Sequence, residues 1–159
     1  MTRLLWILLR FSLCAWIGAA TLFVVTGIQE VTSDLFEPIT KNQLAALRFP
    51  AYYLFGFALV GTGTLAAGLL SVQRSASQKR LRIVLTLCLT TLAIMLVDRV
   101  WIYSPLEELM SRSDARNLPE FATYHTWSKW INFASLSTCL LAAIMSLVDC
   151  NNSTENHND

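Results

Sequence analysis

The sequence predicts an all-α fold, an integral membrane four-helix bundle, and three observations support this. Hydrophobic residues make up 54% of the 159 residues and charged residues only 14%, whereas about a quarter of a typical soluble chain is charged. Four apolar stretches each approach the roughly 20 residues that a helix needs to cross a hydrocarbon core of about 30 Å. Charge is also absent over long runs, such as residues 83–97. A soluble bundle would place polar residues on its outer face at nearly every turn.

Charged, proline or aromatic residues bound the four predicted spans, which cover residues 11–28, 50–72, 82–103 and 127–148. Because lipid offers no hydrogen-bond partners to the backbone, each span is expected to be a helix. Residues 1–150 therefore form one four-pass domain. Residues 151–159 are polar and are expected to form a disordered tail.

The first span is expected to remain in the mature protein. A basic start, an apolar run and small residues at 18–20 resemble a secretory signal. Arg10, however, interrupts the apolar run, and the hydrophobic stretch continues to Val25. Leu4–Leu9 should extend the helix, with Arg3 and Arg10 reaching the lipid headgroups.

Small residues recur at helical spacing in the second span and are candidate helix contacts. Gly56, Gly63 and Ala67 follow this spacing, and Gly18 in the first span offers a matching flat surface. Small residues allow helix backbones to approach closely in lipid. We expect these faces to pack within one chain, and a homodimer through the same face, or contact with another membrane protein, is the alternative.

Each of the two longer links is expected to hold a short interfacial helix. Ser104-Pro105-Leu106-Glu107 has a serine cap, proline at the first helical position and glutamate three residues after the cap. Leu106, Leu109 and Met110 would then share one face. Thr40 with Gln43 suggests a similar helix just before the second span.

The distribution of charged and aromatic residues predicts which ends of the spans face the cytoplasm. The short link at residues 73–81 contains basic residues and no acidic one, whereas the links at 29–49 and 103–125 are mixed. Under the positive-inside rule the short link is cytoplasmic, and so are both termini. An aromatic belt is expected at the opposite boundary, formed by Tyr52, Tyr53, Trp101, Tyr103, Tyr124, Trp127 and Trp130.

Five polar residues near that boundary form the candidate site, namely Asp98, Arg99, His125, Ser128 and Asn132. Ionisable groups inside a membrane are costly and often functional. The last three are spaced i, i+3 and i+7, which places them on one helix face that can meet the end of the third span. The cluster is interpreted either as a set of structural hydrogen bonds between helices or as a pocket for a ligand or ion. The alternative interpretation of Asp98 and Arg99 is that they lie at a helix end and extend their charged groups to the lipid headgroups, without facing the bundle.

No metal, cofactor or nucleic-acid site is expected, and the lipid bilayer is the expected partner. The sequence contains no C-x-x-C pair, P-loop, Gly-rich nucleotide fingerprint or nucleophile elbow. One histidine near a boundary cannot provide a bis-histidine haem or a three-ligand metal site. A formal net charge of +1 provides no broad basic field for nucleic acid.

Several short motifs resemble a known family. They are Trp16-Ile17-Gly18 with Phe23, Phe49-Pro50-Ala51-Tyr52, Pro105, and the run Phe121-Ala122-Thr123-Tyr124-His125-Thr126-Trp127-Ser128 followed by Asn132. With these residues the chain resembles the transmembrane protein 205-like family, a four-pass membrane domain of unknown function. The resemblance implies a four-pass architecture and no established catalytic activity. One departure is Asp98-Arg99, since members of that family tend to carry asparagine near the end of the third span.

The predicted function is that of a multi-pass membrane protein without catalytic activity, an accessory, scaffold or trafficking-type component. The alternative is a membrane oxidoreductase or a small transporter subunit. Such a protein would use His125 with Asp98 as a proton or metal site.

Overall fold

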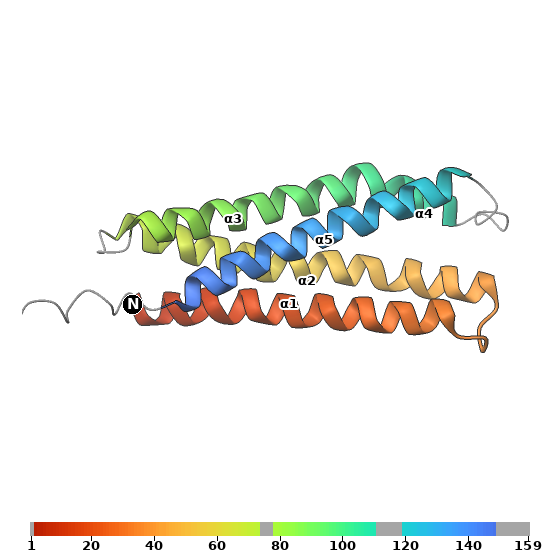
Figure 1. Cartoon of the computed structure of the whole chain (residues 1–159), viewed down its shortest axis with the longest axis horizontal. Coiled ribbons are helices and arrows are strands. Elements are labelled where there is room, and N and C mark those ends of the chain that lie inside the picture. The colour runs from red at the N-terminus through yellow and green to blue at the C-terminus, as the bar shows by residue number, and fades with distance from the viewer. Residues whose placement is uncertain (1, 74–77, 111–118, 149–159) are drawn as a thin grey trace, which may run out of the picture.

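The computed structural model describes residues 2–73, 78–110 and 119–148, and every regular element in these ranges is a helix. The elements are α1 (Thr2–Thr32), α2 (Pro38–Val72), α3 (Gln78–Val97), the π-helix η1 (Asp98–Tyr103), α4 (Ser104–Met110) and α5 (Pro119–Leu147) (Figure 1). The tail predicted at 151–159 lies outside the described residues.

The long helices form an antiparallel bundle in which each packs against two others. Helix α1 contacts α2 and α5, and α3 contacts α2 and α5 (Figure 1). Four helical segments are long and apolar enough to cross a membrane, namely Thr2–Thr32, Pro38–Val72, Gln78–Leu109 and Pro119–Leu147. The prediction of four long apolar helices is therefore confirmed.

Helix α2 starts earlier than the predicted second span and includes the predicted interfacial segment. It begins at Pro38, a first-turn position where the missing proline N–H has no helical partner to lose. It then passes through Pro50 without ending. Ring contacts hold α2 to η1 on both sides of that proline, with ring centroids 4.9 Å apart for Phe49–Tyr103 and 5.2 Å apart for Tyr53–Tyr103. Thr40 and Gln43 therefore lie inside one continuous helix and do not start a separate one.

The capping role predicted for Ser104 is wrong. Ser104 has helical dihedral angles, φ −59° and ψ −48°, so the chain passes directly from η1 into α4. Leu106 and Leu109 are buried, and α4 packs against α5 and α2. The apolar face that was expected to lie on a membrane surface instead completes one end of the bundle, because neighbouring helices are close enough to cover it.

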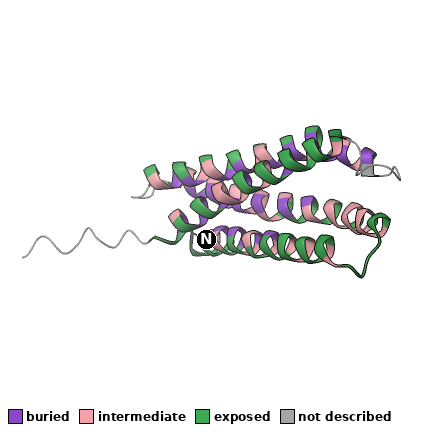
Figure 2. Cartoon of the chain, turned by 45° about the vertical axis from the view of Figure 1, so that its right-hand side comes forward, coloured by how far each residue is buried: buried purple, intermediate pink, exposed green. Residues whose placement is uncertain are grey.

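The core draws residues from all four long helices, and buried residues line their facing sides (Figure 2). Between α1 and α2, large residues of α1 meet small residues of α2. A β-carbon at Gly63 would lie 3.4 Å from Leu13 Cδ2. One at Gly56 would lie 2.7 Å from Trp16 Cη2, closer than side chains normally approach. Gly56 and Gly63 therefore lie close to side chains of α1, and Ala67 is buried on the same helix.

The matching flat surface predicted at Gly18 makes no close contact with the described residues. Gly18 is exposed, and a β-carbon there would meet nothing within 4 Å. Helix α1 instead presents Leu9, Leu13 and Trp16, all buried, to the groove of α2. Large side chains fill the space that small ones leave, so only one of the two helices needs a small face.

Candidate functional site

The buried carboxylate of Asp98 joins three helical segments at one end of the bundle. Asp98 is the first residue of η1 and is 1% exposed. Its Oδ2 atom accepts a hydrogen bond of 2.6 Å from the Tyr53 hydroxyl on α2. The same oxygen accepts one of 2.9 Å from Asn132 Nδ2 on α5. A single oxygen therefore links η1 to α2 and to α5.

Asn132 extends this junction by a second set of contacts. Its Nδ2 atom also donates to the Ser128 carbonyl at 2.9 Å and lies 3.2 Å from Ser128 Oγ. Its Oδ1 atom accepts a hydrogen bond of 2.9 Å from the Tyr52 hydroxyl. We call Asp98, Tyr52, Tyr53, Ser128 and Asn132 the polar junction.

The π-helix places Asp98 on the inside. In this geometry hydrogen bonds run from i to i+5, and such segments are frequent at functional sites. Asp98 and Tyr103, five residues apart, are both buried, whereas Arg99 between them is partly exposed. The widened turn therefore directs the carboxylate and the Tyr103 ring into the bundle and leaves the neighbouring guanidinium near the surface.

Arg99 does not pair with Asp98, its sequence neighbour. Arg99 Nη1 lies 3.8 Å from Glu107 Oε2 on α4. Its guanidinium carbon is 4.8 Å from the centre of the Tyr103 ring and 5.7 Å from that of Tyr53. Arg99 therefore lies beside the polar junction, held by an ion pair and by cation–π contacts.

His125 lies outside the polar junction. Its side chain is exposed, and its ring stacks on Phe121, with centroids 6.0 Å apart and planes 11° apart. Ser128, one turn further along α5, is buried. The structure thus brings together Asp98, Ser128 and Asn132 of the five predicted residues, and it leaves Arg99 and His125 at the edge.

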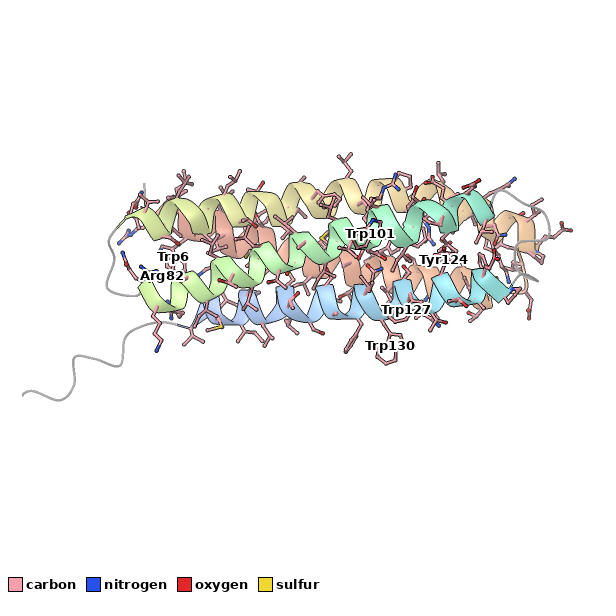
Figure 3. All side chains as sticks on the ribbon, turned by 90° about the horizontal axis from the view of Figure 1, so that it is seen from above. Trp6, Arg82, Trp101, Tyr124, Trp127 and Trp130 are labelled. Atoms are coloured by element: carbon pink, nitrogen blue, oxygen red, sulfur yellow. The ribbon has the colours of Figure 1, made fainter. Side chains whose placement is uncertain are left out.

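Tyr52 and Tyr53 belong to the site although the sequence assigned them to an aromatic belt. Trp101, Trp127 and Trp130 are exposed and lie toward the same end of the bundle (Figure 3). Tyr53, by contrast, is 3% exposed. The missed signal is its register, because Tyr53 precedes Gly56 by three residues and so shares the inward face of the small residues.

Two buried oxygen atoms in this region, Asp98 Oδ1 and the Tyr103 hydroxyl, have no hydrogen-bond partner among the described residues. Within the same part of the chain, no group of three or more His, Cys, Asp or Glu side chains is placed to hold a metal ion. The carboxylate of Asp98 therefore keeps one oxygen available for a further contact, while its other oxygen accepts the hydroxyl and amide hydrogen bonds.

Fold and site together define an all-helical bundle with a buried polar junction at one end. No family model, curated protein or solved structure matches the chain. The resemblance to the transmembrane protein 205-like family therefore stays a prediction.

Asn132→Ala is expected to destabilise the protein more than His125→Ala. The first change removes the bonds to Asp98 and Tyr52, and interhelical hydrogen bonds in membrane proteins average about 0.6 kcal/mol with a maximum near 1.7. We expect a loss of about 1–2 kcal/mol for Asn132→Ala and less than about 0.5 kcal/mol for the exposed His125. Thermal unfolding of both variants in one detergent measures the difference. Equal losses would contradict the geometry of the junction.

Proposed function

We propose that this chain is a four-pass integral membrane protein without catalytic activity, an accessory, scaffold or trafficking-type component whose helices are locked together by the polar junction. One observation carries the proposal, namely an outer surface of large apolar side chains along all four long helices. Phe11 on α1, Leu65 on α2 and Phe133 on α5 are each more than 60% exposed, and Leu96 on α3 is 56% exposed. Soluble monomers rarely expose apolar surface on this scale, whereas lipid tails would cover it at no cost.

The distribution of charge supports a transmembrane arrangement. Where α1 and α3 begin and α5 ends, the charged residues that the structure describes are all basic, namely Arg3, Arg10, Lys79, Arg80 and Arg82. Arg10 Nε donates to the Ser146 carbonyl at 2.9 Å, and Arg80 donates to the Val148 carbonyl. We refer to this region as the basic end. Under the positive-inside rule it faces the cytoplasm, which places both termini there.

The opposite end carries the acidic residues of the described ranges. They are Glu30, Asp34, Glu37, Asp98, Glu107, Glu108 and Glu120. Arg48 Nη2 lies 2.7 Å from Glu30 Oε2, so an ion pair joins α1 to α2 near this end. Charged groups are therefore concentrated at the two ends, as expected for helices whose middles lie in hydrocarbon.

The contacts of the polar junction favour a structural role over a catalytic one. The hydroxyls of Tyr52 and Tyr53 and the amide of Asn132 bond to partners inside the bundle. Groups engaged in this way hold helices together. The unsatisfied Oδ1 atom of Asp98 favours a small transporter subunit as the second candidate. A membrane oxidoreductase would instead copurify with a chromophore, metal or quinone.

Leu65→Lys tests whether the outer surface of the helices faces lipid. Leu65 is 71% exposed on α2, and lysine near the centre of a membrane helix costs about 2.5–3.5 kcal/mol on insertion scales. We expect the wild-type protein to sediment with membranes and to need detergent for extraction, and the variant to lose most of its membrane-inserted yield. Leu35→Lys is the matched control, because Leu35 is 89% exposed in the link between α1 and α2. Monodisperse wild-type protein in a detergent-free supernatant would overturn the proposal.

A further inference from the structure

Asp98 is a buried acid without a basic partner among the described residues. Its only close basic neighbour in sequence, Arg99, is ion-paired with Glu107. The groups that interact with the carboxylate, namely the Tyr53 hydroxyl, the Asn132 amide and the Ser128 hydroxyl, are neutral. A buried carboxylate that lacks a positive counterpart destabilises the fold even when it is hydrogen-bonded.

The two oxygens of this carboxylate are in different situations. Oδ2 accepts both hydrogen bonds, while Oδ1 is buried with no described partner. Native proteins satisfy most buried polar atoms, and an exception calls for a bound species or a function. Oδ1 is therefore the carboxylate oxygen whose lone pairs are available to a neutralising positive charge.

We propose that Asp98 Oδ1 binds one monovalent cation, a proton or a sodium ion, which neutralises the carboxylate inside the bundle. The inference rests on the proposed membrane location and deepens the transporter candidate by naming its ion. One carboxylate supplies one negative charge, and the other groups of the junction are neutral hydroxyls and amides. Divalent cations usually require more carboxylate ligands than this, so the charge balance selects a monovalent ion.

The other titratable or charged groups near Asp98 lie on three elements. They are Tyr52 and Tyr53 on α2, Arg99 and Tyr103 on η1, and Glu107 on α4. Helix α5 contributes the neutral groups of Ser128 and Asn132. His125 is exposed one turn before Ser128, and histidine titrates near neutral pH, so the test must separate its effect from that of Asp98.

The test measures the melting temperature of purified protein in one detergent, for wild type, Asp98→Asn and His125→Gln. In sodium-free buffer at constant ionic strength, a proton site predicts that the wild type becomes less stable as pH rises through the range in which Asp98 releases its proton. The sign follows because the folded state holds a proton that the unfolded state releases, so unfolding is favoured at low proton concentration. A fall of about 3–5 °C per pH unit is expected within the titration range.

The dependence of the melting temperature on sodium concentration distinguishes a sodium site from a proton site. At the high-pH end, sodium chloride is compared with choline chloride. A sodium site raises the melting temperature with sodium concentration by mass action, whereas a proton site shows the pH dependence with no sodium effect. Asp98→Asn should abolish whichever dependence the wild type has, because asparagine has no charge to neutralise. His125→Gln should retain it.

Two results would overturn the inference. One is a wild-type melting temperature that responds to neither pH nor sodium, and the other is a response that persists in Asp98→Asn. If Asp98→Asn does not fold, Tyr53→Phe replaces it, because loss of a donor to Oδ2 should move the midpoint to higher pH or to lower sodium concentration. An unchanged midpoint would then reject Asp98 as the site. A membrane-bound protein that responds to neither ion fails this inference alone and leaves the proposed membrane location standing.

Discussion

Replacing Trp16 with alanine is expected to destabilise the bundle by about 3 kcal/mol or more. Trp16 is 1% exposed and fills the groove beside Gly56. Its ring also packs on Tyr52, with ring centroids 4.9 Å apart. Tryptophan-to-alanine changes in soluble cores cost about 3–5 kcal/mol. In lipid the loss of packing remains, because van der Waals contact drives helix association there.

The Trp16→Ala change should also weaken the polar junction. Tyr52 contacts Trp16 with its ring and donates to Asn132 with its hydroxyl. A cavity beside the ring removes one of the contacts that hold this hydroxyl in place. Denaturant or thermal unfolding in detergent measures the loss, and Trp101→Ala is the control because Trp101 is 70% exposed. Similar losses for the two tryptophans would show that Trp16 is not a core residue.

Gly56→Ala is expected to destabilise the protein by about 1–3 kcal/mol, the usual cost of overpacking. A β-carbon at this position would meet the flexible end of Met95, and it would lie 2.7 Å and 2.9 Å from two atoms of the Trp16 ring, which is rigid and buried. Gly61→Ala on the same helix should instead be neutral or stabilising by up to about 1 kcal/mol, because alanine favours helix over glycine. A β-carbon at Gly61 would meet nothing within 4 Å. Unfolding midpoints of the two variants in one detergent should therefore move in opposite directions, or only that of Gly56→Ala should move.

A double-mutant cycle tests whether the losses of stability in Trp16→Ala and Gly56→Ala both arise from the contact between these two residues. In the Trp16→Ala background the rigid ring is gone and only the flexible end of Met95 remains close to residue 56, so Gly56→Ala should cost less than it does in the wild type. The two losses should therefore not add, as expected for residues in direct contact. Additive losses would show that Met95, and not Trp16, sets the space available at residue 56.

Part of the polar junction was predictable from spacing along one helix. Ser128 and Asn132 are four residues apart on α5, and their shared face does meet Asp98. His125 belongs to the same predicted helix face, but it lies one turn nearer the start of the helix, where its side chain is exposed. Periodicity identifies the direction of a face. It does not say at which turn the neighbouring helix stops covering that face.

Other parts of the site depended on neighbours that no local pattern contains. The serine, proline and glutamate at 104–107 match a helix start, yet the preceding π-helix continues into them. Tyr53 has the composition of an interfacial aromatic, yet its hydroxyl reaches a carboxylate 45 residues away. Arg99 has Glu107 and two tyrosine rings as partners in place of the adjacent acid.

Taken by itself, the sequence determined four long apolar helices and the small-residue face of α2, because helix length, hydropathy and the 3.6-residue period are local properties. The tertiary structure decided which side chains fill the groove and which oxygen of Asp98 is left without a partner. Those outcomes depend on distances between helices, and packing and hydrogen bonding between distant residues are set only when all four helices have taken their places.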